Sequence, residues 1–181
     1  MSVAEWGRWG RIEKLGSEAH RTEKRHRRSV RISHTFSSLL THVVFSTHRR
    51  EPLISGDFRG EMHAYLGGIV RELRGSALMV GGTGDHVHML VKLPCDVAIA
   101  DCMRVVKTNS SRWVHGKWPE RRDFAWQAGY GAFSVSESNR DRVVKYIRQQ
   151  EEHHRKMTFE EELVSFLKKQ GIEFDERYLW G

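Results

Sequence analysis

The sequence has few cysteines and no long apolar run, which argues against a secreted or membrane protein. Only two of its 181 residues are cysteine, Cys95 and Cys102, and two are too few for a disulfide framework. The six residues between them also differ from the two-residue spacing of zinc ribbons. No run approaches the roughly 18 apolar residues of a membrane helix, and the N-terminal residues lack the apolar core of a secretory signal. We therefore expect reduced thiols and a cytoplasmic location.

The sequence also lacks a phosphate-binding loop of the form G-x-x-x-x-G-K-[ST] and an excess of acidic residues. Its 30 Lys and Arg against 23 Asp and Glu give a formal net charge of +7. Residues 1–33 hold nine of the basic residues and four of the acidic ones, with little apolar periodicity. We predict that they form a disordered basic arm. We predict that residues 34–181 form a single domain. Their charges are nearly balanced, so nucleic-acid binding by this domain would have to depend on particular residues at one site rather than on overall positive charge.

Apolar spacing along the domain predicts an α+β fold. A strand is expected within FSSLLTHVVFST, an amphipathic helix over residues 57–73 with Asp57 as a plausible cap, and a hairpin formed by SALMVGG and HVHMLVKL. We expect the glycine-rich segment 81–85 to connect the two hairpin strands. A helix over 97–114, a strand in GYGAFSVS, a helix over 139–154 and a short helix in FEEELVSFLKKQG follow. This order predicts a ferredoxin-like split βαβ sandwich, an antiparallel sheet with helices packed on it.

His86 and His88 form the sharpest local motif, because both lie in a predicted strand with Val87 between them. Side chains alternate across a strand, so the two imidazoles point to one face and Val87 points to the other. Such a pair can ligate a metal ion, although two histidines can also be ordinary residues of a polar face.

Tyr146 and Gln150 are four residues apart in the predicted helix over 139–154, so they share one helix face. The phenol is a possible nucleophile, but a tyrosine between Val143 and Ile147 is more often a core residue. Two imidazoles and a carboxamide oxygen would together form a partial shell for Mg²⁺ or Mn²⁺ with positions left open for a phosphate. Tyr146 could then attack a phosphodiester.

From about Phe36 to the C-terminus the chain resembles the single-tyrosine HUH transposases of the insertion-sequence-200-like type. The matching blocks are HVVFSTHRREPLI, GDHVHMLV, VKTNSSRWVH, FAWQAGYGAFSVS, YIRQQEEHHRK and FDERYLW. The resemblance implies that His86, His88 and Gln150 ligate the metal and that Tyr146 is the nucleophile. Many members of the family have Met-Pro where this chain has Thr83-Gly84, and the family usually begins near Phe36, so the arm is atypical.

The resemblance also implies the reaction and the partners. Members of the family cut and rejoin single-stranded DNA at the ends of mobile elements through a covalent 5′-phosphotyrosine, and they assemble as homodimers. In the family, the tyrosine helix of one subunit can complete the site of the other. The alternatives are a metal-dependent phosphodiesterase that activates water, and a non-catalytic relative that binds DNA hairpins.

Other candidates have weaker support from the sequence. Tyr130 is a rival nucleophile without a liganding residue one helical turn away. His153 and His154 could supplement or replace Gln150 as a ligand, although exposed helix-end histidines are the commoner interpretation. Trp113 or Trp126 could stack on unpaired bases, or both could be core residues. Arginine and lysine side chains expected to contact DNA phosphates are Arg49, Arg50, Arg104, Lys107 and Arg112; alternatively, they are merely solvated.

Overall fold

The computed structural model describes residues 36–175, apart from the side chain of Asp57. The predicted arm over residues 1–33 lies outside the described residues. The elements are β1 (Leu40–Ser46), α1 (Gly56–Glu72), β2 (Ser76–Gly82), β3 (His86–Lys92), α2 (Ile99–Lys117), β4 (Gly131–Val135), α3 (Arg140–Arg148), α4 (Gln150–His153) and α5 (Phe159–Lys169), with short 3-10 turns η2 (His48–Arg50), η3 (Pro119–Arg121) and η4 (Glu137–Asn139).

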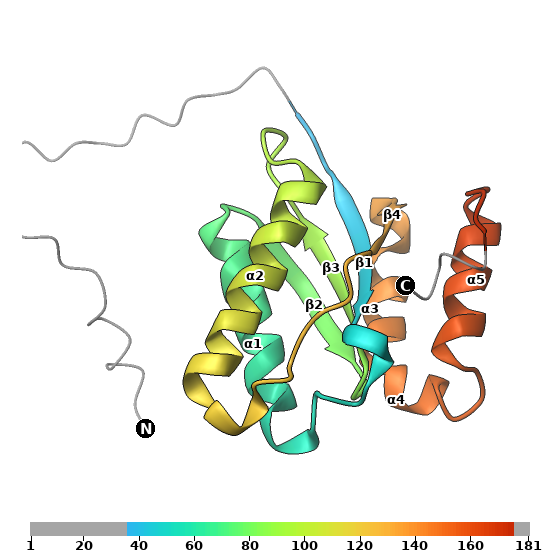
Figure 1. Ribbon diagram of the computed structural model, residues 1–181. Coiled ribbons are helices and arrows are strands. Elements are labelled where there is room, and N and C mark those ends of the chain that lie inside the picture. The colour runs from blue at the N-terminus through green and yellow to red at the C-terminus, as the bar shows by residue number, and fades with distance from the viewer. Residues whose placement is uncertain (1–35, 176–181) are drawn as a thin grey trace, which may run out of the picture. The chain divides into compact units, whose positions relative to one another are not determined.

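The four strands form one sheet in the order β2-β3-β1-β4, and every neighbouring pair is antiparallel. Helices α1 and α2 cover one face, and α3, α4 and α5 lie on the other side (Figure 1). The predicted ferredoxin-like α+β sandwich is therefore confirmed. Among the described residues, no helix has the length and apolarity needed to cross a membrane.

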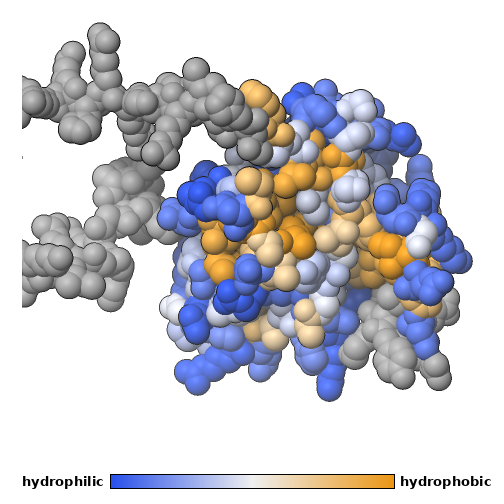
Figure 2. All heavy atoms as spheres, turned by 90° about the horizontal axis from the view of Figure 1, so that it is seen from above, coloured by the Kyte–Doolittle hydropathy of each residue, from blue (hydrophilic) through white to orange (hydrophobic). Residues whose placement is uncertain are grey.

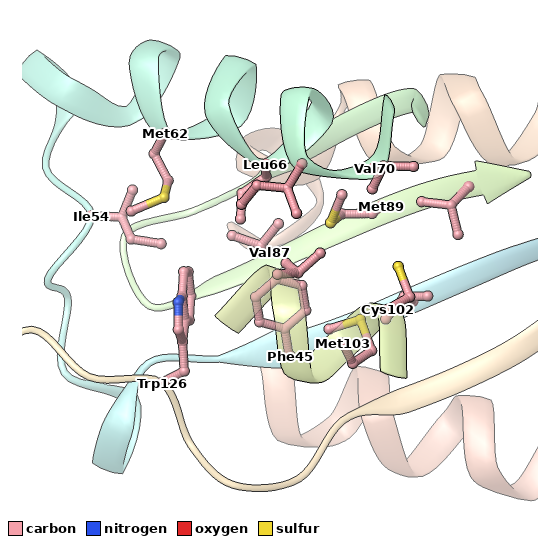
Figure 3. Packing of buried hydrophobic residues seen from close by; sticks show 14 of the residues in the cluster. Phe45, Ile54, Met62, Leu66, Val70, Val87, Met89, Cys102, Met103 and Trp126 are labelled. Carbon is pink, nitrogen blue, oxygen red and sulfur yellow. The ribbon is translucent and has the colours of Figure 1, made fainter. Parts of the chain in front are cut away.

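Alternation along the two central strands separates the core from the face that carries the histidines. Val43 and Phe45 of β1 and Val87 and Met89 of β3 pack beneath α1 and α2 in the largest hydrophobic cluster (Figure 3). The intervening residues of β1 and β3 face α3, α4 and α5. Because both faces of β1 and β3 are covered, a polar side chain on the second face is buried and needs a partner.

Three local expectations about element boundaries were wrong. Helix α1 begins at Gly56 with Ser55 as its N-cap, so Asp57 lies inside the helix. Gly81 and Gly82 belong to β2, and the connection to β3 is shorter than expected. The expected continuous helix over 139–154 is interrupted at Gln149, which is the C-cap of α3 and donates its backbone N–H to the carbonyl oxygens of Lys145 and Tyr146.

Apolar side chains are not confined to the interior. Seen from above, they gather toward the middle of the described part of the molecule, and hydrophilic side chains surround them (Figure 2). Large apolar side chains that are exposed include Phe36 and Leu39 before β1, and Leu78 at an irregularity in the pairing of β2 with β3. Exposed apolar side chains are ordinary on a protein surface and do not by themselves mark a site.

Candidate active site

His86 and His88 are buried side by side on the face of β3 that α3, α4 and α5 cover. Their exposed fractions are 1% and 0%, and their ring centroids are 5.1 Å apart. Val87 lies on the opposite face in the core, as the strand alternation predicts. Burial excludes the interpretation of the two histidines as ordinary residues of a solvated polar face.

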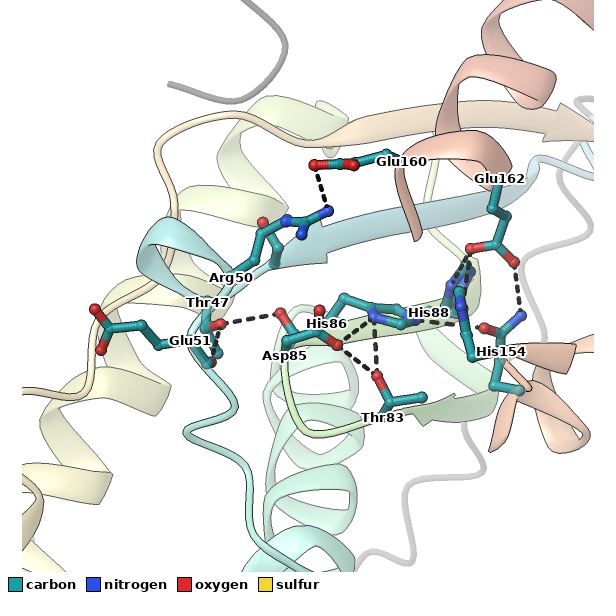
Figure 4. A network of polar contacts seen from close by, with 12 residues as sticks. Thr47, Arg50, Glu51, Thr83, Asp85, His86, His88, His154, Glu160 and Glu162 are labelled. Carbon is teal, nitrogen blue, oxygen red and sulfur yellow. Dashed lines mark hydrogen bonds and ion pairs between the residues drawn. The ribbon is translucent and has the colours of Figure 1, made fainter. Parts of the chain in front are cut away.

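Asp85 and Thr83 fix the orientation of the His86 ring. Nδ1 of His86 lies 2.8 Å from Asp85 Oδ1 and 2.9 Å from Thr83 Oγ1 (Figure 4). Burial opposes ionisation of Asp85, but hydrogen bonds from His86 and Thr83 outweigh it and lower the pKa of Asp85 to about 2. A carboxylate at Nδ1 favours the tautomer with its proton there, which leaves the Nε2 lone pair of His86 free to bind a metal ion.

His42 of β1 holds the second imidazole. Its Nε2 lies 3.0 Å from Nδ1 of His88, and the two rings are stacked with centroids 5.2 Å apart. Burial lowers the pKa of His42 to about 4. Burial and the neighbouring histidines also hold the pKa of His88 well below its usual value. Both rings are therefore neutral near pH 7 and share one hydrogen bond, and Nε2 of His88 points away from His42 toward α5.

Gln150 and Tyr146 reach the same site from α4 and α3. The amide oxygen of Gln150 is 3.4 Å from Nε2 of His86, and the residue is fully buried. The half-buried ring of Tyr146 lies edge-on to His88 with centroids 6.0 Å apart. The structure thus brings together all four site residues that the sequence suggested, although a break at Gln149 separates the two helices that carry them.

Two further residues, His154 and Glu162, belong to the same cluster. One donor atom from each of His86, His88, His154 and Glu162 lies within 4.8 Å of those of the other three. His154 is not an exposed helix-end histidine, because α5 packs beside it. Sequence reasoning missed Glu162. The available indication was an acidic residue on the apolar face of the helix that also carries Phe159, Leu163 and Phe166.

The donor set fits a divalent cation. The Nε2 lone pair of His86 and the amide oxygen of Gln150 are both acceptors, and they face each other at 3.4 Å. Burial and, to a smaller extent, the charge of Asp85 raise the pKa of Glu162 to about 8. Burial is also the main cause that lowers the pKa of His154 to about 4. Imidazole nitrogens with carboxylate and amide oxygens are ordinary ligands of divalent transition metals.

Tyr146 also lines a hollow of about 360 Å³ beside this cluster. The hollow has two basic side chains on its wall, Arg142 and Lys169, together with the ring of Phe166. Its size is within the range of small-ligand sites. A phosphate and its sugar would therefore have both space and positive charge next to the phenol.

The five expected phosphate contacts are spread over the molecule. Arg49 and Arg50 lie in the turn after β1, and Arg50 forms an ion pair with Glu160 of α5 at 2.9 Å. Arg104 and Arg112 are exposed on α2, in the layer on the other side of the sheet from the histidines. Lys107 donates to the carbonyl oxygens of Gln127 (2.8 Å), Ala128 (3.1 Å) and Gly129, so its ammonium group holds a loop.

The aromatic candidates lie apart from the histidine cluster. Trp126 is a core residue whose Nε1 donates to Ser110 Oγ at 2.8 Å. Trp113 stacks on Tyr65 with centroids 4.4 Å apart, so neither indole ring is a free platform for a base. Tyr130, the rival nucleophile, is 38% exposed just before β4 and belongs to a separate hollow, lined also by Phe45 and Gln127.

Comparison with known proteins gives a family match and a similar protein of known type. The family model described as "Transposase IS200 like" matches residues 35–150. The ISDra2 transposase TnpA of Deinococcus radiodurans is 24% identical over 114 residues, which are 60% of this chain and 81% of that protein.

Two solved structures share the fold. One is a chain from Deinococcus radiodurans R1 assigned as a transposase, with a TM-score of 0.53 and 20% identity over 65% of this chain and 95% of that chain. The other is a REP-associated tyrosine transposase bound to a REP hairpin, with a TM-score of 0.51 and 15% identity over 77% of this chain and 74% of that chain. The family match spans well over half of the sequence and includes β3 and Tyr146. The chain therefore belongs to the family of IS200-like transposases.

Proposed function

We propose that the protein cleaves and rejoins single-stranded DNA with Tyr146 as the nucleophile and a divalent metal, Mg²⁺ or Mn²⁺, held by His86, His88 and Gln150. The observation that carries the proposal is the placement of the Tyr146 ring 6.0 Å from the ring of His88, within one chain and beside a hollow with basic walls. Tyr146 follows His88, the nearer of the two histidines, by 58 residues in the sequence, so the fold has to bring them together.

The chemistry follows from these groups. The phenol oxygen of Tyr146 attacks the phosphorus in line with the leaving 3′-oxygen, so a bond from tyrosine to phosphorus forms while the bond from phosphorus to the 3′-oxygen breaks. The phenol gives up its proton during the attack, and the leaving oxygen takes one up to become a 3′-hydroxyl. When bound, a divalent ion neutralises and orients the phosphate. Arg142 and Lys169 add positive charge at the hollow.

The covalent product is a 5′-phosphotyrosine that conserves the free energy of the phosphodiester. A later 3′-hydroxyl attacks the same phosphorus, which expels the phenol and rejoins two DNA strands. This reversal requires no nucleotide. The reaction is therefore a strand transfer, as in transposition of a mobile element, rather than a hydrolysis.

The proposed partners are DNA hairpins and a second copy of the chain. One relative with this fold is bound to a REP hairpin, which supports hairpin-forming element ends as the DNA. We propose phosphate contacts through the exposed or half-buried arginines Arg49, Arg50, Arg104 and Arg112. Lys107 would have to leave its three carbonyl partners to contact DNA. A homodimer and a cytoplasmic location complete the proposal.

An assay for a covalent adduct tests this function. Purified protein is incubated with Mg²⁺ or Mn²⁺ and labelled single-stranded DNA that carries the palindromes flanking its own gene. We expect a protein-linked DNA band on a denaturing gel for the wild type, no band for Tyr146→Phe, and an undiminished band for Tyr130→Phe.

The alternatives predict different results. Cleavage without an adduct in both the wild type and Tyr146→Phe would indicate a phosphodiesterase that activates water. Tight binding of the hairpin without cleavage in either protein would indicate a non-catalytic hairpin-binding relative. An adduct that persists in Tyr146→Phe and disappears in Tyr130→Phe would move the nucleophile to Tyr130.

A further inference from the structure

Helix α5 inserts a carboxylate between the histidines of the metal site. Glu162 is 3% exposed, and its Oε2 lies 3.3 Å from Nε2 of His88 and 3.4 Å from Nε2 of His154. Its other oxygen, Oε1, accepts a hydrogen bond of 3.1 Å from the amide nitrogen of Gln150. The carboxylate thus contacts side chains from β3, from α4 and from the turn that follows α4 (Figure 4).

The three facing atoms have no hydrogen bond. Oε2 of Glu162, Nε2 of His88 and Nε2 of His154 are all buried without a hydrogen-bond partner. Nδ1 of His154 lies 2.9 Å from the carbonyl oxygen of Met157. A carbonyl only accepts, so the ring donates its Nδ1 proton there and turns a bare Nε2 lone pair toward Glu162. Lone pairs that converge in a buried space are stabilised by a cation placed between them.

The spacing of these atoms also matches that of ligands on one ion. Adjacent ligands on one ion with bonds of about 2.0–2.2 Å lie about 3 Å from each other, whether the ion has four ligands or six. The separations of 3.3 and 3.4 Å from Glu162 to the two imidazoles are close to this value. Three imidazole nitrogens and one carboxylate oxygen form a set better suited to transition-metal ions than to Mg²⁺.

We propose that Glu162 and His154 are ligands of the same divalent ion that His86 and His88 hold, so that the ion ties α5 to β3. The inference rests on the metal site of the proposed function and extends it to a segment outside residues 35–150, the part of the chain that matches the family. Binding of the ion then reinforces the docking of α5 over the sheet. Loss of the ion leaves α5 held by its apolar contacts with Phe133 and Val44.

Direct metal binding by the full-length protein tests the proposal without DNA. Protein stripped with a chelator is titrated with Co²⁺, whose visible absorption reports coordination, and the dissociation constant is compared between variants. We expect Glu162→Gln and His154→Gln to weaken Co²⁺ binding by at least about tenfold and to lower the absorption intensity. Glu160→Gln makes the same replacement of a carboxyl by an amide at a partly exposed position of the same helix, so its Co²⁺ affinity should stay within about twofold of the wild type.

Two outcomes would overturn the inference in distinguishable ways. If Glu162→Gln binds Co²⁺ as the wild type does while His88→Ala loses binding, α5 supplies no ligand, yet the metal site of the proposed function stands. If the wild type itself binds no Co²⁺, the metal site fails as well, and the adduct assay with Tyr146→Phe decides separately whether the tyrosine is the nucleophile.

Hydrogen exchange of α5 gives a second test, and its deciding comparison uses the wild type alone. Amide protons of Phe159–Lys169 should exchange more slowly when Co²⁺ is present, whereas those of α1 should change little because α1 lies on the other side of the sheet. In Glu162→Gln the ion should no longer slow exchange in α5. Equal exchange of α5 with and without Co²⁺, in a wild type that binds the ion, would contradict the proposal.

Discussion

Each histidine of the pair on β3 is held at Nδ1 by a neighbouring side chain, so that its Nε2 faces the site. Asp85 and Thr83 hold His86, and His42 holds His88. Partners of this kind fix the tautomer and the ring orientation of metal-binding histidines. The ionised Asp85 also increases the electron density on His86, because the proton between them is shared with a carboxylate.

Removal of Asp85 should weaken metal binding although Asp85 is not itself a proposed ligand. In Asp85→Ala the ring of His86 loses its charged acceptor and can rotate or change tautomer, so we expect the affinity for Mn²⁺ to fall by about 10- to 100-fold. Calorimetric titration measures this change. Asp96→Ala, which removes an exposed carboxylate paired with Arg74, is the control. Equal affinities in both variants would show that Asp85 does not orient His86.

At the residue scale, the sequence predicts those residues of the site that form short motifs. It does not predict the residues that reach the site only through packing between elements that are distant in the sequence. His86 and His88 were recognisable because strand alternation is local, and Gln150 because its distance from Tyr146 is one helical turn. Glu162 was not, because it is one of three consecutive glutamates and only the docking of α5 selects it for burial. His42 was missed for the same reason, since its contact with His88 depends on how β1 pairs with β3.

At the scale of elements, α3 lies against β2 at Gly81, and the absence of a side chain there permits that approach. A Cβ atom added to Gly81 would lie 2.5 Å from the carbonyl oxygen of Ile147 and 2.9 Å from its Cγ2. Ile147 follows Tyr146 directly, so the height of α3 above the sheet also sets the position of the phenol. The sequence alone predicts a turn at Gly81, because glycine is typical of turns and a pattern of residue types does not show which backbone will pack against it.

Gly81→Ala should therefore displace α3 and destabilise the fold. We expect the free energy of unfolding in urea to fall by about 1–3 kcal/mol, as for overpacked cores, and adduct formation by Tyr146 to fall with it. Gly116→Ala is the matched control, because a Cβ there meets nothing within 4 Å and lies in helix α2. It should be neutral or stabilise by up to about 1 kcal/mol. A fully stable Gly81→Ala would show that α3 can move away from β2 at little cost.

The order and type of the elements were more predictable than their ends. The apolar alternation of β1 and β3 and the helical spacing of α1 and α2 are imposed by burial, which the residue types report directly. The residue types around Gln149 do not indicate the break between α3 and α4. It separates α3, which packs on β2, from α4, which carries Gln150 toward His86, and no glycine or proline marks it in the sequence.

At the scale of the whole molecule, the proposed site residues lie together within a single chain. Tyr146, His88 and Glu162 all come from the same chain, and the tyrosine helix lies against its own sheet. In the family, the tyrosine helix of one subunit can instead complete the site of the other. The two arrangements need the same side chains and differ in which subunit supplies Tyr146 and the residues that follow it, so mixed variants can distinguish them.

Equal amounts of His88→Ala and Tyr146→Phe are mixed, allowed to exchange subunits, and assayed for the covalent DNA adduct. If each site is completed within one chain, no site in the mixture contains both residues, and we expect no adduct above the level of either variant alone. If sites are completed across a two-fold dimer, random exchange gives one intact site in half of the dimers, so about a quarter of all sites would react. Sedimentation under the conditions of the adduct assay gives an independent test. If the wild type is monomeric there and still forms the adduct, the first arrangement is supported, because a monomer has no partner to supply the phenol.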